Sequence, residues 1–249
     1  MGYNKHMAKL LGFEVNEFTF DEAVEFAKQN RGHVVTINPE IIEQTNKDKG
    51  LAQIIHEADL VIPDGIGVQI GLKILGYNVR RIAGIEFARE MLEEMKGSPI
   101  ALIGAKPHVI EKAVKNLQAE IDGLNIVYCR DGYFKNEYNV DEYKKAINDI
   151  VSAKPDLVLV ALGSPLQDYF IYELKPKLPN ALLIGVGGSF DVWAGEVERA
   201  PEIYQKLGLE WLYRTIKEPK RFKRIFPTLP LFVLKVLLDG VKNVICRRN

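Results

Sequence analysis

Six short runs of apolar, mostly β-branched residues recur along this chain, and they constrain its fold more than any other feature. The runs cover residues 33–37, 60–62, 100–103, 126–129, 157–162 and 182–186. Between them, apolar residues repeat at the helical period of 3.6, as over residues 20–30, 39–56, 107–121 and 138–152. Near-continuous apolar strands that alternate with helices are typical of a parallel sheet covered on both faces. The pattern therefore predicts an α/β fold with a mainly parallel sheet.

The end of the chain differs from the rest in charge. The protein has 249 residues, with 33 Lys and Arg against 33 Asp and Glu. From Arg214 onward, ten basic residues face only Glu218 and Asp239, so this segment carries +8 and the first 213 residues carry −8. Within it, Pro227 and Pro230 predict a short break before an apolar helix. We expect a Rossmann-like core over residues 1–195 and a helical, basic appendage over residues 196–249.

The appendage also mixes its basic residues with aromatic and aliphatic ones, including Trp211, Phe222 and Leu231. This mixture favours an anionic membrane surface over a plain solvated helix face, and both over nucleic acid, because the rest of the chain is acidic. The longest apolar run, residues 229–238, is too short to span a bilayer. The start has no signal-peptide pattern, and Cys129 and Cys246 form no C-x-x-C motif. We expect a reduced cytoplasmic protein that contacts the inner face of the membrane.

Several enzyme classes lack their motifs in this sequence. There is no G-x-x-x-x-G-K-[ST] phosphate loop and no G-x-S-x-G nucleophile elbow, and the glycines of residues 65–71 do not fit a dinucleotide loop. The four histidines are scattered and no two aspartates are spaced D-x-D. We therefore expect neither a metal site nor another cofactor.

Polar or glycine-rich clusters follow five of the six predicted strands. Because the carboxyl ends of parallel strands share one edge of a sheet, these loops are expected to converge on one ligand crevice. The clusters contain Thr36 and Asn38, then Asp64, then Gly104 and Lys106, then Gln167, and finally the glycine-rich segment from Gly185 and Gly187 to Asp191.

Each candidate residue has a functional and a structural interpretation. Asp64 follows an apolar strand and precedes glycines, which suits a general base, but an aspartate there also caps helices. Thr36 and Asn38 could equally well hydrogen-bond a sugar or cap the helix that follows Pro39. Gln167 lies at a helix start, where free N–H groups favour phosphate. Arg81, in a helix–helix connection, either reaches a diphosphate or is a solvated surface residue.

The motifs occur in an order that covers nearly the whole chain. They are Thr36-x-Asn38-x-Glu40, Pro63-Asp64-Gly65-x-Gly67, Arg80-Arg81-x-x-Gly84, Leu162-Gly-Ser-Pro-x-Gln167, Gly185-Val-Gly-Gly-Ser-Phe-Asp191, Arg199-Ala-Pro201 and Gly208-Leu-Glu-Trp211. With these motifs the chain closely resembles the WecG/TagA/CpsF family of bacterial glycosyltransferases. Within this family, the chain most resembles the branch of TagA-like enzymes of wall teichoic acid synthesis.

The resemblance implies that N-acetylmannosamine passes from its UDP derivative to N-acetylglucosaminyl-diphospho-undecaprenol, in an inverting, metal-independent reaction that forms a β-1,4 linkage. It implies that Asp64 is the general base and that Thr36, Asn38 and Gln167 line the sugar and acceptor pocket. It further implies a set of arginines that hold the diphosphates, namely Arg81, Arg214, Arg221 and Arg224. The expected partners are the UDP-sugar, the lipid-linked acceptor and the membrane surface, with a homo-oligomer left open.

One motif departs from the family pattern. Relatives commonly carry Pro-Lys-Gln-Glu where this chain has Pro165-Leu166-Gln167-Asp168. The change bears on donor identity more than on reaction class, since relatives use other UDP-sugars. Two alternatives therefore stay open: another donor, such as N-acetylmannosaminuronic acid or a hexose, and a sugar-nucleotide-binding module without catalysis.

Overall fold

A six-stranded sheet forms the centre of the protein in the computed structural model, which describes residues 6–133, 140–207, 209–217 and 222–246. Its strands are β3 (Gly32–Ile37), β4 (Leu60–Pro63), β5 (Ile100–Gly104), β6 (Ile126–Arg130), β7 (Leu157–Ala161) and β8 (Leu182–Gly185). They lie in the order β4-β3-β8-β7-β5-β6, and every neighbouring pair is parallel. All six predicted runs are strands, so the predicted α/β class with a mainly parallel sheet is confirmed.

Helices cover both faces of this sheet. They are α1 (Phe20–Asn30), α2 (Pro39–Thr45), α3 (Lys49–His56), α4 (Ile66–Ile74), α5 (Gly84–Glu94), α6 (Pro107–Glu120), α7 (Val140–Ala153), α8 (Leu166–Leu174), the 3₁₀ turn η1 (Lys175–Lys177) and α9 (Ser189–Trp193). Side chains of one strand alternate between the faces. Leu182 and Ile184 of β8 pack in a cluster with α1, α5 and α6, whereas Leu183 packs in a cluster with α7 and α8.

The predicted helix over residues 39–56 is two helices, α2 and α3. Asp48 ends the connection between them, because its side-chain Oδ1 accepts a hydrogen bond from the Leu51 backbone N–H at 3.0 Å. An aspartate in this position starts a new helix by satisfying one of its free N–H groups. The single-helix prediction was wrong for this reason.

The start of the chain forms an antiparallel hairpin that the sequence patterns did not reveal. Strands β1 (Met7–Leu10) and β2 (Phe13–Asn16) are joined by Leu11 and Gly12, which both have positive φ, 50° and 92°. Such a two-residue turn matches the twist of the paired strands. The Asn16 side chain then accepts a hydrogen bond from the Val61 backbone N–H of β4 at 2.9 Å.

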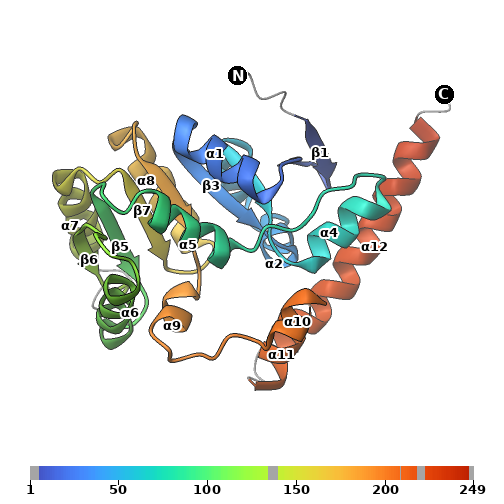
Figure 1. Cartoon of the computed structure of the whole chain (residues 1–249). Coiled ribbons are helices and arrows are strands. Elements are labelled where there is room, and N and C mark those ends of the chain that lie inside the picture. The colour runs from blue at the N-terminus through green and yellow to red at the C-terminus, as the bar shows by residue number, and fades with distance from the viewer. Residues whose placement is uncertain (1–5, 134–139, 208, 218–221, 247–249) are drawn as a thin grey trace.

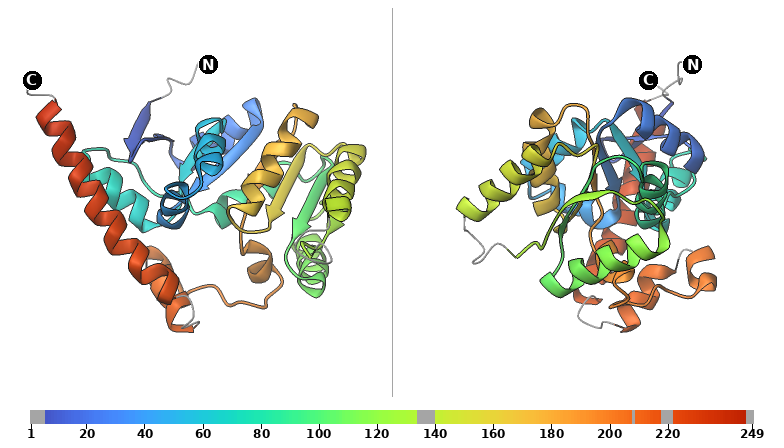
Figure 2. Two further views of the ribbon diagram at one scale, coloured as in Figure 1. Left: turned by 180° about the vertical axis from the view of Figure 1, so that it is seen from behind. Right: turned by 60° about the vertical axis from the view of Figure 1, so that its left-hand side comes forward.

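Three helices follow α9 and reach the last described residue. They are α10 (Glu202–Lys206), α11 (Glu210–Lys217) and α12 (Phe222–Cys246). In Figure 1 the chain passes below the sheet to α10 and α11, and α12 then rises along the side of the molecule beside α4. Figure 2 shows the same arrangement from behind.

Helix α12 continues through Pro227 and Pro230, so the predicted break there was wrong. The helix packs against α2 and α4, and its Phe232 and Val236 are fully buried in the cluster that includes the β1–β2 hairpin. We attribute the continuity to this packing, which offsets the two missing backbone donors. The division into a core of residues 1–195 and an appendage stays a prediction. In the described part of the chain, no helix is long and apolar enough to cross a membrane.

Candidate active site

A cleft of about 440 Å³ lies at the carboxyl ends of β3, β4, β7 and β8, where the sequence predicted a crevice. Loops after these strands form one wall, and residues of α11 and α12 form another. The cleft brings together six of the predicted site residues: Thr36, Asn38, Asp64, Arg81, Gln167 and Gly187.

The loop after β3 places Thr36 and Asn38 in the cleft. Asn38 is the N-cap of α2, and its side-chain Oδ1 accepts a hydrogen bond from the Ile41 N–H at 3.0 Å. The capping interpretation of Asn38 therefore holds, and it leaves the residue in the cleft wall. Thr36 lies against the start of α5, where a Cβ on Gly84 would come within 2.9 Å of the Thr36 Cγ2. Glycine at position 84 lets α5 begin directly beside β3.

Asp64 directly follows β4 and lines the cleft. Its backbone N–H donates to the Ile37 carbonyl at 2.8 Å, which continues the β3–β4 pairing by one residue. The N-cap position of α4 belongs to Gly65, with φ of 81°, rather than to Asp64. Gly65 and Gly67 also line the cleft. Because glycine has no side chain, a ligand can come close to the backbone on this side.

Gln167 connects the loops that follow β7 and β8. Its Oε1 accepts hydrogen bonds from the Gly163 N–H at 3.2 Å and from the Gly187 N–H at 3.1 Å. A Cβ on Gly185 would lie only 2.6 Å from the Gln167 Nε2. Gly185 is therefore a glycine that makes room for Gln167, and it is not among the cleft-lining residues.

Arg81 connects the segment before α5 with α10. Its Nη2 donates to the Gln205 carbonyl at 2.7 Å, and its backbone N–H donates to the Gln69 side chain at 2.8 Å. The guanidinium is thus held at the end of α10 while the residue lines the cleft. Asp191 is not among the lining residues; its backbone carbonyl accepts from Glu196 and Val197 and closes the turn after α9.

The three other predicted arginines are not described at the side-chain level. Arg214 lies within α11 and Arg224 within α12, and the side chains of both fall outside the described part. Arg221 lies outside the described residues altogether. Their proposed contact with diphosphate stays a prediction.

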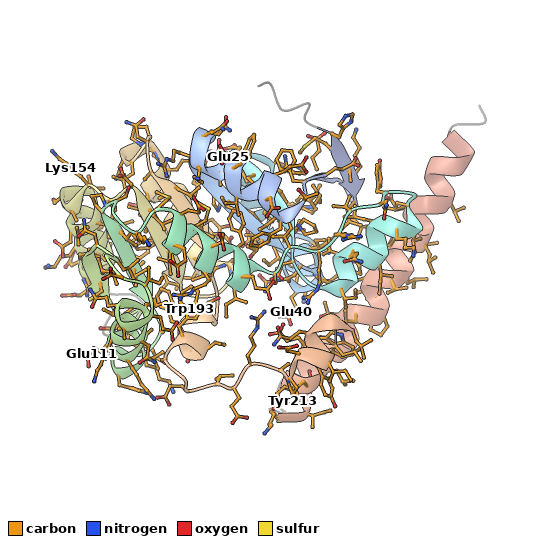
Figure 3. All side chains as sticks on the ribbon, in the orientation of Figure 1. Glu25, Glu40, Glu111, Lys154, Trp193 and Tyr213 are labelled. Carbon is orange, nitrogen blue, oxygen red and sulfur yellow. The ribbon has the colours of Figure 1, made fainter. Side chains whose placement is uncertain are left out.

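Several lining residues were not identified from the sequence as site residues. Trp211 of α11 and Leu229 of α12 close the wall opposite the strands, and Glu40 and Gln44 of α2 add polar groups. Figure 3 shows Glu40 between the lower end of α2 and the helices α10 and α11. These residues come from elements separated in sequence, so only their packing reveals them as one site.

The residue that follows Gln167 on α8 is a buried carboxyl, Asp168. Asp168 is only 2% exposed, and burial raises its pKa to about 6, partly opposed by a hydrogen bond from Ser164. Among the described residues, its Oδ2 has no hydrogen-bond partner. The Ser164 Oγ also lies 3.0 Å from the Gln44 Oε1, and its single hydrogen is donated either to Gln44 or to Asp168. Ser164 and Gln44 both line the cleft, so Asp168 neighbours the cleft through Ser164. No group of three or more His, Cys, Asp or Glu in the described ranges is placed to hold a metal ion.

The cleft lies at the carboxyl edge of an open parallel sheet, where α/β proteins bind small polar ligands. It is lined by glycine-rich backbone, by Arg81 and by three acidic residues, Glu40, Asp64 and Glu210. Residues 8–244 match the family model described as "Glycosyl transferase WecG/TagA/CpsF family". The chain belongs to this family, as its motifs indicated, and it is a glycosyltransferase.

Two similar curated proteins bear the name N-acetylglucosaminyldiphosphoundecaprenol N-acetyl-beta-D-mannosaminyltransferase. The one from Bacillus spizizenii is 33% identical over 228 residues, which cover 90% of this chain and 86% of the relative. The one from Bacillus subtilis is 37% identical over 218 residues, which cover 86% of this chain and 82% of the relative.

Proposed function

We propose that this chain transfers N-acetylmannosamine from UDP-N-acetylmannosamine to N-acetylglucosaminyl-diphospho-undecaprenol, with inversion, without a metal or other cofactor, and with formation of a β-1,4 linkage. The names of both relatives contain this sugar and this acceptor. The observation that carries the proposal to this chain is the position of Asp64. It lines the cleft together with Thr36, Asn38, Gly65 and Gly67.

In the proposed reaction, Asp64 acts as the general base. Its carboxylate accepts the proton of the acceptor's 4-hydroxyl while that oxygen bonds to the anomeric carbon. The bond from the anomeric carbon to the UDP oxygen breaks at the same time, and its electron pair leaves with UDP. A single displacement from the opposite side inverts the anomeric centre. Thr36, Asn38 and Gln167 orient the sugars in this scheme, and Gly187 lines the wall beside them. Gly185 and Asp191 support that wall indirectly, since Gly185 makes room for Gln167 and Asp191 closes the turn after α9.

The negative charge that develops on the leaving diphosphate needs cationic donors. Arg81 supplies one, because only one of its five N–H donors is used by the Gln205 carbonyl in the bond above. We propose that Arg214, Arg221 and Arg224 of the basic appendage supply the others. Arginine suits this task because its planar guanidinium binds phosphate oxygens in pairs.

Replacement of the proposed base tests the assignment. For Asp64→Asn we expect kcat to fall by at least about 100-fold, because the amide cannot accept the proton, with little change in UDP affinity by calorimetry. Asp21→Asn, which removes the same charge from an exposed position of α1, is the control and should retain full turnover. Unreduced turnover of Asp64→Asn with donor and lipid acceptor would show that another group is the base.

Another UDP-sugar donor is the alternative that a specific observation favours. Leu166, which replaces the lysine common in relatives, is 44% exposed, so this chain lacks a cation at that point of α8. A panel of UDP-sugars, assayed with one short-chain acceptor analogue, distinguishes the donors. Turnover with none of them while UDP still binds would instead indicate a non-catalytic sugar-nucleotide-binding module.

We also propose that the protein works on the cytoplasmic face of the membrane and contacts it through the appendage. Leu234, Leu238 and Val241 form an outward stripe on α12 and are 54%, 54% and 57% exposed. Residues spaced four and three apart share one face of a helix. An exposed apolar stripe within the basic segment is the combination that binds anionic lipid surfaces.

A further inference from the structure

A second apolar surface lies along the contact between α4 and α12, and it borders the outward stripe, because Leu237 is three residues from Leu234 and four from Val241. On α4 it consists of Ile66, Ile70 and Ile74, each four residues from the next. On α12 it consists of Leu229, Val233 and Leu237, with the same spacing. We call these six residues the apolar strip. Figures 1 and 2 show the two helices side by side, and they are in contact.

The contacts of neighbouring residues place both halves of the strip on one side. Gly71 of α4 faces α12, since a Cβ there would be 3.1 Å from the Phe232 ring. Leu72 is fully buried toward the hairpin core, so Ile70, about 200° away around the helix, lies on the opposite flank.

On α12, Lys235 pairs with Glu43 of α2, at 2.7 Å between Nζ and Oε2. The helix α2 belongs to the same core cluster as Leu72. Val233 lies about 160° around α12 from Lys235 and therefore also turns away from this core. The two helices run in the same direction along their contact, because Gly67 meets Leu229 near the cleft and Gly240 meets Leu75 farther along. Their isoleucine and leucine rows thus border the same side of the contact.

The strip begins inside the cleft and continues out of it. Ile66 and Leu229, its first members, are both cleft-lining residues. The following members are exposed: Ile70 by 46%, Ile74 by 41%, Val233 by 38% and Leu237 by 48%. From Ile66 to Ile74 the strip extends over eight residues, or about 12 Å of helix. A molecule bound in the cleft therefore meets a continuous apolar surface in this direction along α4 and α12.

We propose that the apolar strip binds the isoprenoid chain of the lipid-linked acceptor next to its diphosphate. The inference rests on the proposed function, which places a polyprenyl diphosphate in the cleft. Its sugar and diphosphate are polar and suit the Asp64 and Arg81 end, whereas the chain that follows is a hydrocarbon and gains from leaving water. Continuity of the strip with the cleft at Ile66 and Leu229 selects this occupant over a bilayer acyl chain, which needs no path from the cleft.

The test compares two acceptors in detergent micelles, one with an undecaprenyl chain and one with a short, water-soluble alkyl chain. For the double variant Ile70→Ser/Val233→Ser we expect the KM of the undecaprenyl acceptor to rise about tenfold, because apolar contact is lost. The KM of the short acceptor, the KM of the donor and kcat should stay unchanged. The control is Val127→Ser/Val140→Ser, which removes exposed apolar side chains from β6 and α7, outside both the strip and the outward stripe, and should leave both acceptor KM values unchanged.

The other possible results would each contradict a specific part of the proposal. Equal KM changes for both acceptors, or none, would overturn the strip as the chain-binding surface while leaving the transferase reaction intact. An equal effect of the control pair would show that loss of any exposed apolar side chains raises this KM, and it would overturn the strip as a specific surface. Absence of transfer to either acceptor by the unsubstituted protein would overturn the proposed function and this inference with it. Circular dichroism of each variant confirms that it folds.

Discussion

At the scale of single residues, the cleft is built from side chains whose orientation the backbone fixes. Two loop N–H groups hold the Gln167 carboxamide oxygen, one helix N–H holds that of Asn38, and the Gln205 carbonyl holds the Arg81 guanidinium. Such partners fix the rotamer of a residue before a ligand arrives, which reduces the entropy lost on binding. A buried histidine at the opposite edge of the sheet, His33, has its pKa lowered to about 3 by burial and stays neutral.

Asp168 makes the stability of the protein depend on pH. Its folded pKa of about 6 lies above the 3.8 of an aspartate in the unfolded chain, so its contribution to stability is present below pH 3.8 and lost as the pH rises through 6. Asp168→Asn does not titrate. As the pH rises from 4 to 7.5, the free energy of unfolding of the parent should therefore fall relative to that of the variant by roughly 2–3 kcal/mol. Urea denaturation across this range measures the difference.

Ser164→Ala is the matched variant for this prediction. The Ser164 hydrogen bond lowers the pKa of Asp168, so its removal should move the pH window of the difference upward. A difference between Asp168→Asn and the parent that is constant with pH would contradict the assignment of the titration to Asp168.

At the scale of secondary-structure elements, the packing of α12 decides how the end of the chain is arranged. The Phe232 ring fills the space beside Gly71, and no residue with a Cβ fits at position 71 without a shift. The Lys235–Glu43 pair contributes less, because its ammonium side chain is 32% exposed and surface ion pairs contribute about 0–1 kcal/mol. Burial of Phe232 and Val236 therefore holds the helix against α2 and α4.

Phe232→Ala tests this ranking. We expect a loss of about 3–5 kcal/mol in free energy of unfolding and faster backbone hydrogen exchange along α12. Lys235→Ala should cost no more than about 1 kcal/mol, and Leu234→Ala, on the exposed face, about 0.5 kcal/mol or less. Larger losses for Lys235→Ala than for Phe232→Ala would mean that the ion pair, not apolar burial, holds α12 in place.

At the scale of the whole molecule, charge and apolar surface are separated along the chain. The last 36 residues carry +8 and the rest −8, and the outward stripe of α12 belongs to the positive part. A membrane with anionic lipids attracts this part and repels the remainder, which orients the molecule. Truncation after Gly195 should abolish both liposome binding and transfer, but it also removes Trp211 and Leu229 from the cleft wall. Substitutions on the stripe separate the two effects.

For Leu234→Glu/Leu238→Glu we expect the affinity for liposomes with phosphatidylglycerol to fall by at least about tenfold, since two apolar contacts are replaced by repelled charges. Co-sedimentation measures the binding, and higher salt should weaken that of the parent by screening. Val127→Glu, at a β6 position 42% exposed, is the control and should bind as the parent does. Unchanged binding of the stripe variant would contradict the membrane contact proposed for α12.

Much of the fold could be predicted because its signals are local. In a strand or a helix, apolar residues repeat along the chain at the period of that element. All six strands and the polar clusters after them could therefore be predicted from the sequence. The hairpin was missed because its signal is short, with a single glycine at a turn that also uses Leu11. The continuity of α12 was missed because Pro227 and Pro230 are local signals for a break, and the packing that overrides them comes from distant residues.

The sequence by itself determined the α/β class, the family and the position of Asp64 at the end of a strand. The tertiary structure alone decided the strand order, the contact of Gly185 with Gln167, the burial of Asp168 and the meeting of α4 with α12 at the cleft. The physical reason is the range of the interactions. Periodicity and motifs depend on neighbours along the chain, whereas a cleft wall depends on which distant side chains fill the same space.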